Sequence, residues 1–198
     1  MPGVERRMLD RIGGEIARAT TIVRYAANSH FSEHCHTGGE EFIVLEGIFQ
    51  DENGNYPAGT YVRNPPTTNH SPRSDQGCTI FVKLWQFDMQ DRKQFHLTMP
   101  EASATTKGAI KTAILHQHRY ETVKYIEVQA GANLTLDASG GVEILVLSGT
   151  IAESGDVLRQ GSWLRCPSQV KITSIAGNHG AKVWVKLGHL TNTKAPIN

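Results

Sequence analysis

The sequence predicts an all-β protein built from two copies of one β-module. Short segments in which β-branched or aromatic residues alternate with polar ones recur along the chain, separated by Gly, Pro, Asn and Asp. Sustained helical periodicity is absent, apart from one short helical turn expected near Met8. A stretch of about fifty residues then recurs at a fixed offset, which is typical of a duplicated module.

Six segments carry the clearest strand pattern, and a turn signal lies between two alternating runs. The turn is the sequence Asp-Glu-Asn-Gly-Asn at residues 51–55, which favours a hairpin. The predicted strands are 19–25, 41–46, 79–87, 122–128, 143–147 and 182–187.

The repeat is strongest between residues 38–47 and 140–149, where six of ten positions are identical at an offset of 102. At an offset of one residue more, residues 81–84 fall on residues 184–187. Further matches at the offset of 102 are Gly59 on Gly161, Tyr61 on Trp163, Arg63 on Arg165 and Pro65 on Pro167. The segment 98–110, rich in Ala, Thr and Ser, is the expected linker, so we expect modules at 1–100 and 101–198.

Charge and cysteine content narrow the class of protein. Twenty Lys and Arg balance nineteen Asp and Glu, which removes any global electrostatic case for binding nucleic acid or an anionic membrane. Cys35, Cys78 and Cys166 are an odd number without a Cys-x-x-Cys pair, as in a reducing compartment. No signal peptide and no membrane-spanning run is recognised, so we expect a cytoplasmic protein.

Four side chains in the first module form a candidate ligand set for a metal: His34, His36, Glu40 and His70. Along a strand His34 and His36 share a face, and Gly38-Gly39 lets the chain bend so that Glu40 converges on them. His70 ends a later strand. Three imidazoles and a carboxylate suit one divalent ion, Fe, Mn, Ni or Zn, which the residues alone do not rank.

The spacing resembles the two motifs of the cupin family, His-x-His-x3-Glu-x6-Gly and Gly-x5-Pro-x-Gly-x2-His. Gly59 and Pro65 match the second motif, whereas Thr67 replaces its later Gly and Asn28 replaces an early Gly of the family. The resemblance implies a double-stranded β-helix, the cupin jelly roll, in two tandem modules.

Residues 38–47, 58–66 and 77–84 look more narrowly like the cupin-like domain of ChrR-type anti-sigma factors. That resemblance implies zinc inside the first barrel, held by His34, His36, Glu40 and His70. ChrR proteins hold their sigma factor with an N-terminal zinc domain carrying His-x3-Cys-x2-Cys, a motif that this sequence lacks. The chain therefore resembles the sensing module without its sigma-binding partner.

The second copy acts as an internal control because all four ligand positions are apolar in it. At the offset of 102 the equivalents are Leu136, Ala138, Val142 and Ile172. An imidazole and carboxylate cluster without its metal is costly to bury, whereas aliphatic side chains fill a barrel directly. We therefore expect a degenerate second module without metal, kept for packing or assembly.

Residues that persist in both copies are expected to stabilise the module. Glu41 recurs as Glu143, so a structural role is favoured over coordination. The same reasoning covers Arg63 with Arg165 and Lys83 with Lys186.

Other candidate ligands are set aside. His116 and His118 lack a following Glu and are expected on a surface or edge strand, and His30 lies ~13 Å from His34 along a strand. Cys35 has the opposite parity to its neighbours and should point away from the metal. Phe81, Trp85 and Gln86 lie on a strand that can line the pocket. The sequence does not show which of these three residues faces inward.

Two functions from different classes follow. The first is a metal-binding sensory module, in which an oxidant or small-molecule ligand changes the coordination and thereby an exposed surface. The alternative is a mononuclear Fe(II) dioxygenase resembling the acetylacetone-cleaving cupins, which typically use three histidines, so that Glu40 is a departure. A metal-free storage bicupin is the third candidate function. Barrels of this type often pair through edge strands, so a homodimer is a further expectation. No catalytic residue is assigned.

Overall fold

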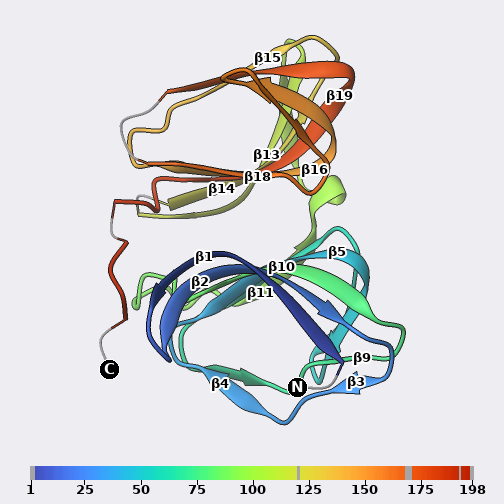
Figure 1. Cartoon of the computed structure of the whole chain (residues 1–198), viewed down its shortest axis with the longest axis vertical. Helices are drawn as coiled ribbons and strands as arrows, with labels where there is room; N and C mark the ends of the chain where they lie inside the picture. The colour runs from blue at the N-terminus through green and yellow to red at the C-terminus, as the bar shows by residue number, and fades with distance from the viewer. Residues whose placement is uncertain (1–2, 120, 168–170, 192, 197–198) are drawn as a thin grey trace. The chain divides into compact units, whose positions relative to one another are not determined.

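The computed structural model describes residues 3–119, 121–167, 171–191 and 193–196. The chain divides into two compact units, Met1–Thr98 with Thr193–Asn198 and Met99–Asn192. Each unit is an antiparallel sheet that curls around its own interior (Figure 1). A single turn of 3-10 helix, Met99–Glu101, is the only helix among the described residues, so the predicted all-β fold is confirmed.

Unit 1 contains one large sheet and one separate ribbon of two strands. The main strand order is β1 (Val4–Gly13), β2 (Ala17–Tyr25), β10 (Cys78–Leu84), β5 (Glu40–Asp51), β7 (Thr60–Asn64) and β11 (Phe95–Thr98). Off this path, β6 (Gly54–Pro57) and β9 (Arg73–Ser74) pair with β5, and β3 (Ser29–His30) pairs with β9. The ribbon consists of β4 (His34–His36) and β8 (Thr68–His70), which pair with each other.

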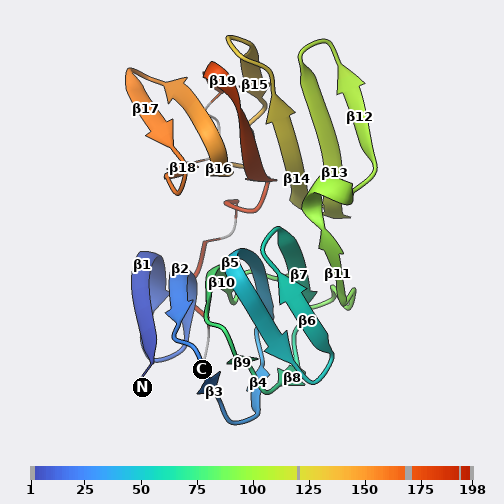
Figure 2. The same cartoon turned by 90° about the vertical axis from the view of Figure 1, so that its right-hand side faces the viewer.

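Unit 2 repeats this arrangement in one sheet (Figure 2). Its order is β12 (Ala104–Lys107), β13 (Ile110–His118), β14 (Glu121–Val128), β19 (Ile172–Leu187), β16 (Val142–Glu153) and β17 (Asp156–Arg159). Off this path, β15 (Asn133–Leu136) pairs with β19 and β18 (Trp163–Cys166) pairs with β16.

The cross-strand register confirms the sequence repeat. In unit 1, β10 places Lys83 and β7 places Arg63 opposite Glu41 of β5. The corresponding pairs in unit 2 are Lys186 and Arg165 opposite Glu143. Two tandem modules of the same topology are therefore present.

The interiors of the two units differ in chemistry. The core of unit 1 combines aliphatic with aromatic residues, with the rings of Phe42 and Phe49 4.6 Å apart and Tyr56 beside them. The core of unit 2 is aliphatic. It includes the four positions equivalent to the predicted ligands, each at most 5% exposed: Leu136, Ala138, Val142 and Ile172. Hydrocarbon thus occupies in unit 2 the place that polar groups take in unit 1.

The other face of β5 carries a buried ionic network around Glu41. Arg63 donates from Nη1 to Glu41 Oε2 at 2.7 Å and from Nη2 to Asp91 Oδ2 at 2.8 Å. The hydroxyl of Tyr61 donates to the same Glu41 oxygen at 2.8 Å. The equivalent pair in unit 2, Arg165 Nε and Glu143 Oε1, is 3.4 Å apart. Glu41 therefore joins neighbouring strands.

Two local expectations were wrong. Residues around Met8 form part of strand β1, not a helical turn, because the segment pairs with β2 along its length, with a bulge between Met8 and Asp10. The expected linker at 98–110 contains the 3-10 turn and strand β12, which forms a hairpin with β13 in which Lys107 pairs with Ile110.

No helix in the described part of the chain has the length and apolar character needed to span a membrane.

Candidate metal centre

The ribbon of β4 and β8 brings three histidines together. His34 lies opposite His70 in its register, and His36, two residues further along β4, projects to the same side. The ring centroids are 4.8 Å apart for His34 and His36, 5.2 Å for His34 and His70, and 4.8 Å for His36 and His70. Among the described residues, this is the one group of three or more His, Cys, Asp or Glu that could hold a metal ion.

Glu40 reaches the group from the main sheet, as its position after Gly38-Gly39 predicts. Its Oε2 lies 3.5 Å from Nε2 of His36 and 3.5 Å from Nε2 of His70. The Asn64 amide donates to the same oxygen at 3.3 Å. Glu40 thus touches two histidines, and it stands outside the three-histidine group itself.

Two turns that depart from the cupin motifs keep the backbone conformation for which glycine is favoured. Thr67 has φ of 75° and Asn28 has φ of 60°, both in the left-handed region. The Thr67 amide donates to the carbonyl of His36 at 2.9 Å, which ties β4 to the turn before β8. The substitutions therefore leave the placement of the histidines intact.

The four side chains differ in their access to solvent. His70 and Glu40 are buried, His36 is half-buried and His34 is exposed. On the inner side the Phe49 ring lies 5.9 Å from that of His70. The group therefore lies between a packed aromatic interior and an open rim at His34.

Hydrogen bonds from the Nδ1 atoms of His34 and His70 orient these two rings. Nδ1 of His34 lies 3.1 Å from the carbonyl of Ser32, which can only accept, so this nitrogen carries the proton and Nε2 is left to bind a metal. Nδ1 of His70 lies 3.3 Å from Asp51 Oδ2. The Nε2 atoms of His36 and His70 face each other at 2.9 Å.

Burial and neighbouring charges shift the pKa values of these groups in different directions. Burial lowers the pKa of His36 and outweighs the opposing effect of Glu40. For His70, burial acts to lower the pKa, but the hydrogen bond to Asp51 and the charges of Glu40 and Asp51 raise it overall. Burial would raise the pKa of Asp51, yet its hydrogen bonds with His70, Asn53 and Tyr56 lower it. The lowered pKa of His36 favours its neutral form, the form that binds metals.

The donors of His36, His70 and Glu40 meet the distance limit for one divalent transition metal, and the ligand atoms of the three histidines lie within 4.8 Å of one another. Ligand atoms at about 2.1 Å from one ion lie at most about 4.2 Å from each other. The separations of 2.9 Å between the Nε2 atoms of His36 and His70, and of 3.5 Å from each to Glu40, satisfy that limit. When bound, such an ion would supply Lewis acidity.

The residues set aside from the sequence do not join the group. His30 and Cys35 are exposed and lie outside it. The expectation that His116 is at the surface was wrong, since its side chain is covered and the residue is 3% exposed. At His116, strand β13 pairs only with β14, because β12 pairs with residues 110–113. His118 is half-buried, with its ring stacked 6.4 Å from that of His116.

Of the three residues whose inward face was left open, Phe81 and Gln86 are buried. Phe81 alternates with Ile80 and Val82, which belong to the core of unit 1, so Phe81 faces the other side of β10. Gln86 donates to the Ala19 carbonyl at 2.7 Å. No sequence signal identifies Asp51 as a site residue, because an Asp in a turn segment is ordinary.

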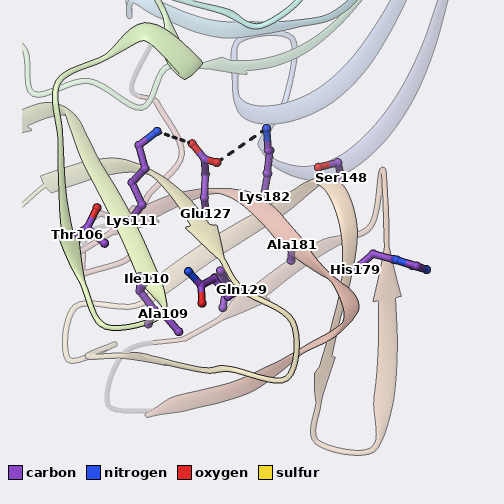
Figure 3. A pocket seen from close by; sticks show the side chains of 11 residues that line it. Thr106, Ala109, Ile110, Lys111, Glu127, Gln129, Ser148, His179, Ala181 and Lys182 are labelled. Carbon is purple, nitrogen blue, oxygen red and sulfur yellow. Dashed lines mark hydrogen bonds and ion pairs between the residues drawn. The ribbon is translucent and has the colours of Figure 1, made fainter.

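Unit 2 has a groove of a different character (Figure 3). Lys111 and Lys182 both approach Glu127 there, at 3.0 Å and 3.9 Å. Its lining includes one carboxylate and one imidazole, Glu127 and His179. The groove therefore lacks the ligand set found in unit 1.

A family model for the ChrR cupin-like domain matches the chain twice, at residues 1–88 and 98–191. No curated protein matches the chain. Several solved structures share its fold.

A candidate dioxygenase from Nostoc punctiforme is 12% identical, with a TM-score of 0.74, and the match covers 98% of this chain and 84% of that one. A cupin 2 conserved barrel domain protein from Leptotrichia buccalis is 14% identical, with a TM-score of 0.64 and coverage of 92% and 88%. Salicylate 1,2-dioxygenase from Pseudaminobacter salicylatoxidans is 13% identical, with a TM-score of 0.69 and coverage of 91% and 75%. These likenesses show the fold alone.

Proposed function

The chain belongs to the ChrR cupin-like family, and on that premise we propose that it is a metal-dependent sensory module for an oxidant or small ligand. One divalent transition metal is held in unit 1 by His34, His36, Glu40 and His70. Zinc is the favoured ion from the family resemblance, because four protein donors complete a tetrahedral site. The family membership does not extend the proposal to sigma-factor binding.

The observation that carries the sensory role is the separate ribbon of β4 and β8. Each of its strands has three residues, and the two pair with each other in a sheet of their own. Two short strands that pair only with each other are marginally stable at best in water. Three of the four proposed ligands lie on this ribbon, and the fourth, Glu40, lies on the main sheet. A bound ion therefore joins the ribbon to the sheet, and its loss or altered coordination would release an exposed surface.

Unit 2 supports this reading by contrast. The pair equivalent to His34 and His70 is Leu136 opposite Ile172, and it joins β15 to the long strand β19 of the main sheet. Where the ligands are absent, the equivalent of the ribbon is part of the sheet. The separation of the ribbon thus accompanies the metal ligands.

Metal content tests the first part of the proposal. Protein purified without a nickel column is expected to contain about one equivalent of a divalent transition metal by elemental analysis. His36→Ala should lose it, whereas His30→Ala, a control at an exposed histidine outside the group, should retain it. Equal metal content in both variants would refute the assigned ligands.

Amide hydrogen exchange tests the sensory part. Removal of the metal should speed exchange at the amides of β4 and β8, while those of β15 in unit 2 stay unchanged and serve as the control. Equal amide exchange rates in β4 and β8 with and without the metal would contradict a sensory role.

The alternative dioxygenase is tested separately by oxygen uptake. An octahedral ion with these four ligands retains two positions for oxygen and a substrate, which a dioxygenase needs. Fe(II)-loaded protein that consumes oxygen with a β-diketone would support the enzyme instead. We expect no such uptake.

A further inference from the structure

Asp51 is a buried carboxylate that ends β5 beside the metal centre. It is 6% exposed, and three groups surround it. Its Oδ1 accepts from the Asn53 amide at 2.8 Å and from the Tyr56 hydroxyl at 3.1 Å, while its Oδ2 lies 3.3 Å from Nδ1 of His70. A carboxylate that accepts from Nδ1 leaves Nε2 of the ring as the metal-binding atom.

We propose that Asp51 is a positioning residue of the metal centre, which holds the His70 ring with Nε2 directed toward His36 and Glu40, and that Tyr56 fixes Asp51 in turn. This inference rests on the proposed metal site. Outer carboxylates of this kind fix the tautomer and orientation of a ligating histidine and make it more basic. Asp51 itself does not touch the ion in this assignment.

The second module supplies independent support because the whole chain of contacts is absent there. His70 becomes Ile172, and Tyr56, which bonds to Asp51, becomes Leu158. The residue equivalent to Asp51 is Glu153, which is half-buried and accepts from its neighbour Ser154 at 2.8 Å. The strand register is the same, with Phe49 opposite Tyr56 and Ile151 opposite Leu158. Unit 2 thus lacks both the imidazole that His70 supplies in unit 1 and the Tyr56 hydroxyl that bonds to Asp51.

The first test measures zinc affinity by competition with a chelator. Asp51→Leu removes the acceptor and is expected to weaken zinc binding by about 10- to 100-fold. Asp51→Asn keeps one acceptor oxygen without the charge, so its loss should be smaller, as partial rescue. The control is Glu52→Gln, which removes a neighbouring charge from a residue that bonds to the Ser71 amide at 2.9 Å and not to the His70 ring. Its affinity should stay within about twofold of the wild type.

The second test reads the tautomer of His70 directly and needs no metal. Long-range nitrogen–proton NMR of the metal-free wild type, at a pH where His70 is neutral, should show the proton on Nδ1. Asp51→Leu should show a mixture of tautomers. A wild-type proton on Nε2 would overturn the proposal even if the variant fails to fold.

The outcomes separate the two proposals. Unchanged zinc affinity in both Asp51 variants refutes the positioning role and leaves the metal site standing. A wild-type protein that binds no divalent metal refutes the proposed function, while the tautomer still reports on the contact between Asp51 and His70. An equal loss in Glu52→Gln would show a general effect of charge and would also refute positioning by Asp51.

Discussion

Glu40 and Glu41 are adjacent in β5, yet their carboxylates lie on opposite faces of the sheet. Oε2 of Glu40 is 3.5 Å from Nε2 of both His36 and His70. Oε2 of Glu41 accepts from Arg63 at 2.7 Å. Successive residues of a strand point to opposite sides, so one carboxylate belongs to the candidate metal centre and its neighbour to the support of the sheet. Substitutions at the two positions should therefore have different effects.

Glu40→Gln is expected to weaken metal binding with little effect on the metal-free fold. The amide retains the size of the side chain but removes the anionic donor that faces two imidazoles. We expect at least a tenfold loss of zinc affinity by chelator competition, and a loss of no more than about 1 kcal/mol, the typical cost of one substitution, in the free energy of unfolding of the metal-free protein. An unaltered affinity would remove Glu40 from the ligand set.

Glu41→Gln should do the reverse. Arg63 and Glu41 are both 1% exposed, so the substitution leaves a buried guanidinium with one carboxylate, Asp91, in place of two. Breaking a buried ion pair typically costs about 3–5 kcal/mol. Urea denaturation should show a loss near the lower end of that range, because Asp91 remains. Zinc affinity of the folded variant should stay within about twofold, and a larger change would assign Glu41 to the metal centre.

A matched pair of glycine substitutions tests how the chain positions Glu40. Gly39 has φ of 78°, and a Cβ there would lie 2.6 Å from the Phe87 ring. Its equivalent Gly141 has φ of 81°, and a Cβ would lie 2.4 Å from Leu190 Cβ. Both alanine variants should lose about 1–3 kcal/mol of stability in denaturant titrations, from backbone strain and overpacking.

Only Gly39→Ala should also weaken zinc binding, because it displaces the residue before Glu40. Gly141→Ala precedes Val142, which binds nothing, and controls for general destabilisation. Equal zinc affinities in the two folded variants would contradict the placement of Glu40 by this turn.

Ile172→His restores an imidazole at the position equivalent to His70, but we expect it to destabilise unit 2 without creating a metal site. The residue is fully buried in an aliphatic core opposite Leu136, so the ring would lack a polar partner. A buried polar group without a hydrogen bond costs about 1–3 kcal/mol in proteins. Thermal unfolding should detect that loss, and Ile172→Val, at about 0.5–1.5 kcal/mol, gives the reference for lost volume. A second equivalent of bound zinc would show that one histidine suffices.

The sequence predicts the clustering of His34, His36 and His70 because strand parity and turn chemistry are local properties. The spacing of His34 and His36 places both rings on one side, and the repeat identifies Glu41 as structural through Glu143. Thr67 shows that a motif position can keep its left-handed backbone without glycine.

The features that the sequence missed depend on partners distant along the chain. The charged segment of β1 has no clear alternation, and it becomes a strand through pairing with β2. Burial of His116 depends on what covers β13, which periodicity does not report. Asp51 stands in a recognisable turn, whereas His70, which gives it a role, lies nineteen residues further on.

The aliphatic interior of the second module has a consequence for metal scarcity. Since aliphatic side chains take the positions equivalent to the proposed ligands in that module, we expect its folding to proceed without a bound ion. Under metal starvation we expect unit 2 to remain folded, and only unit 1 to change through loss of its proposed ion.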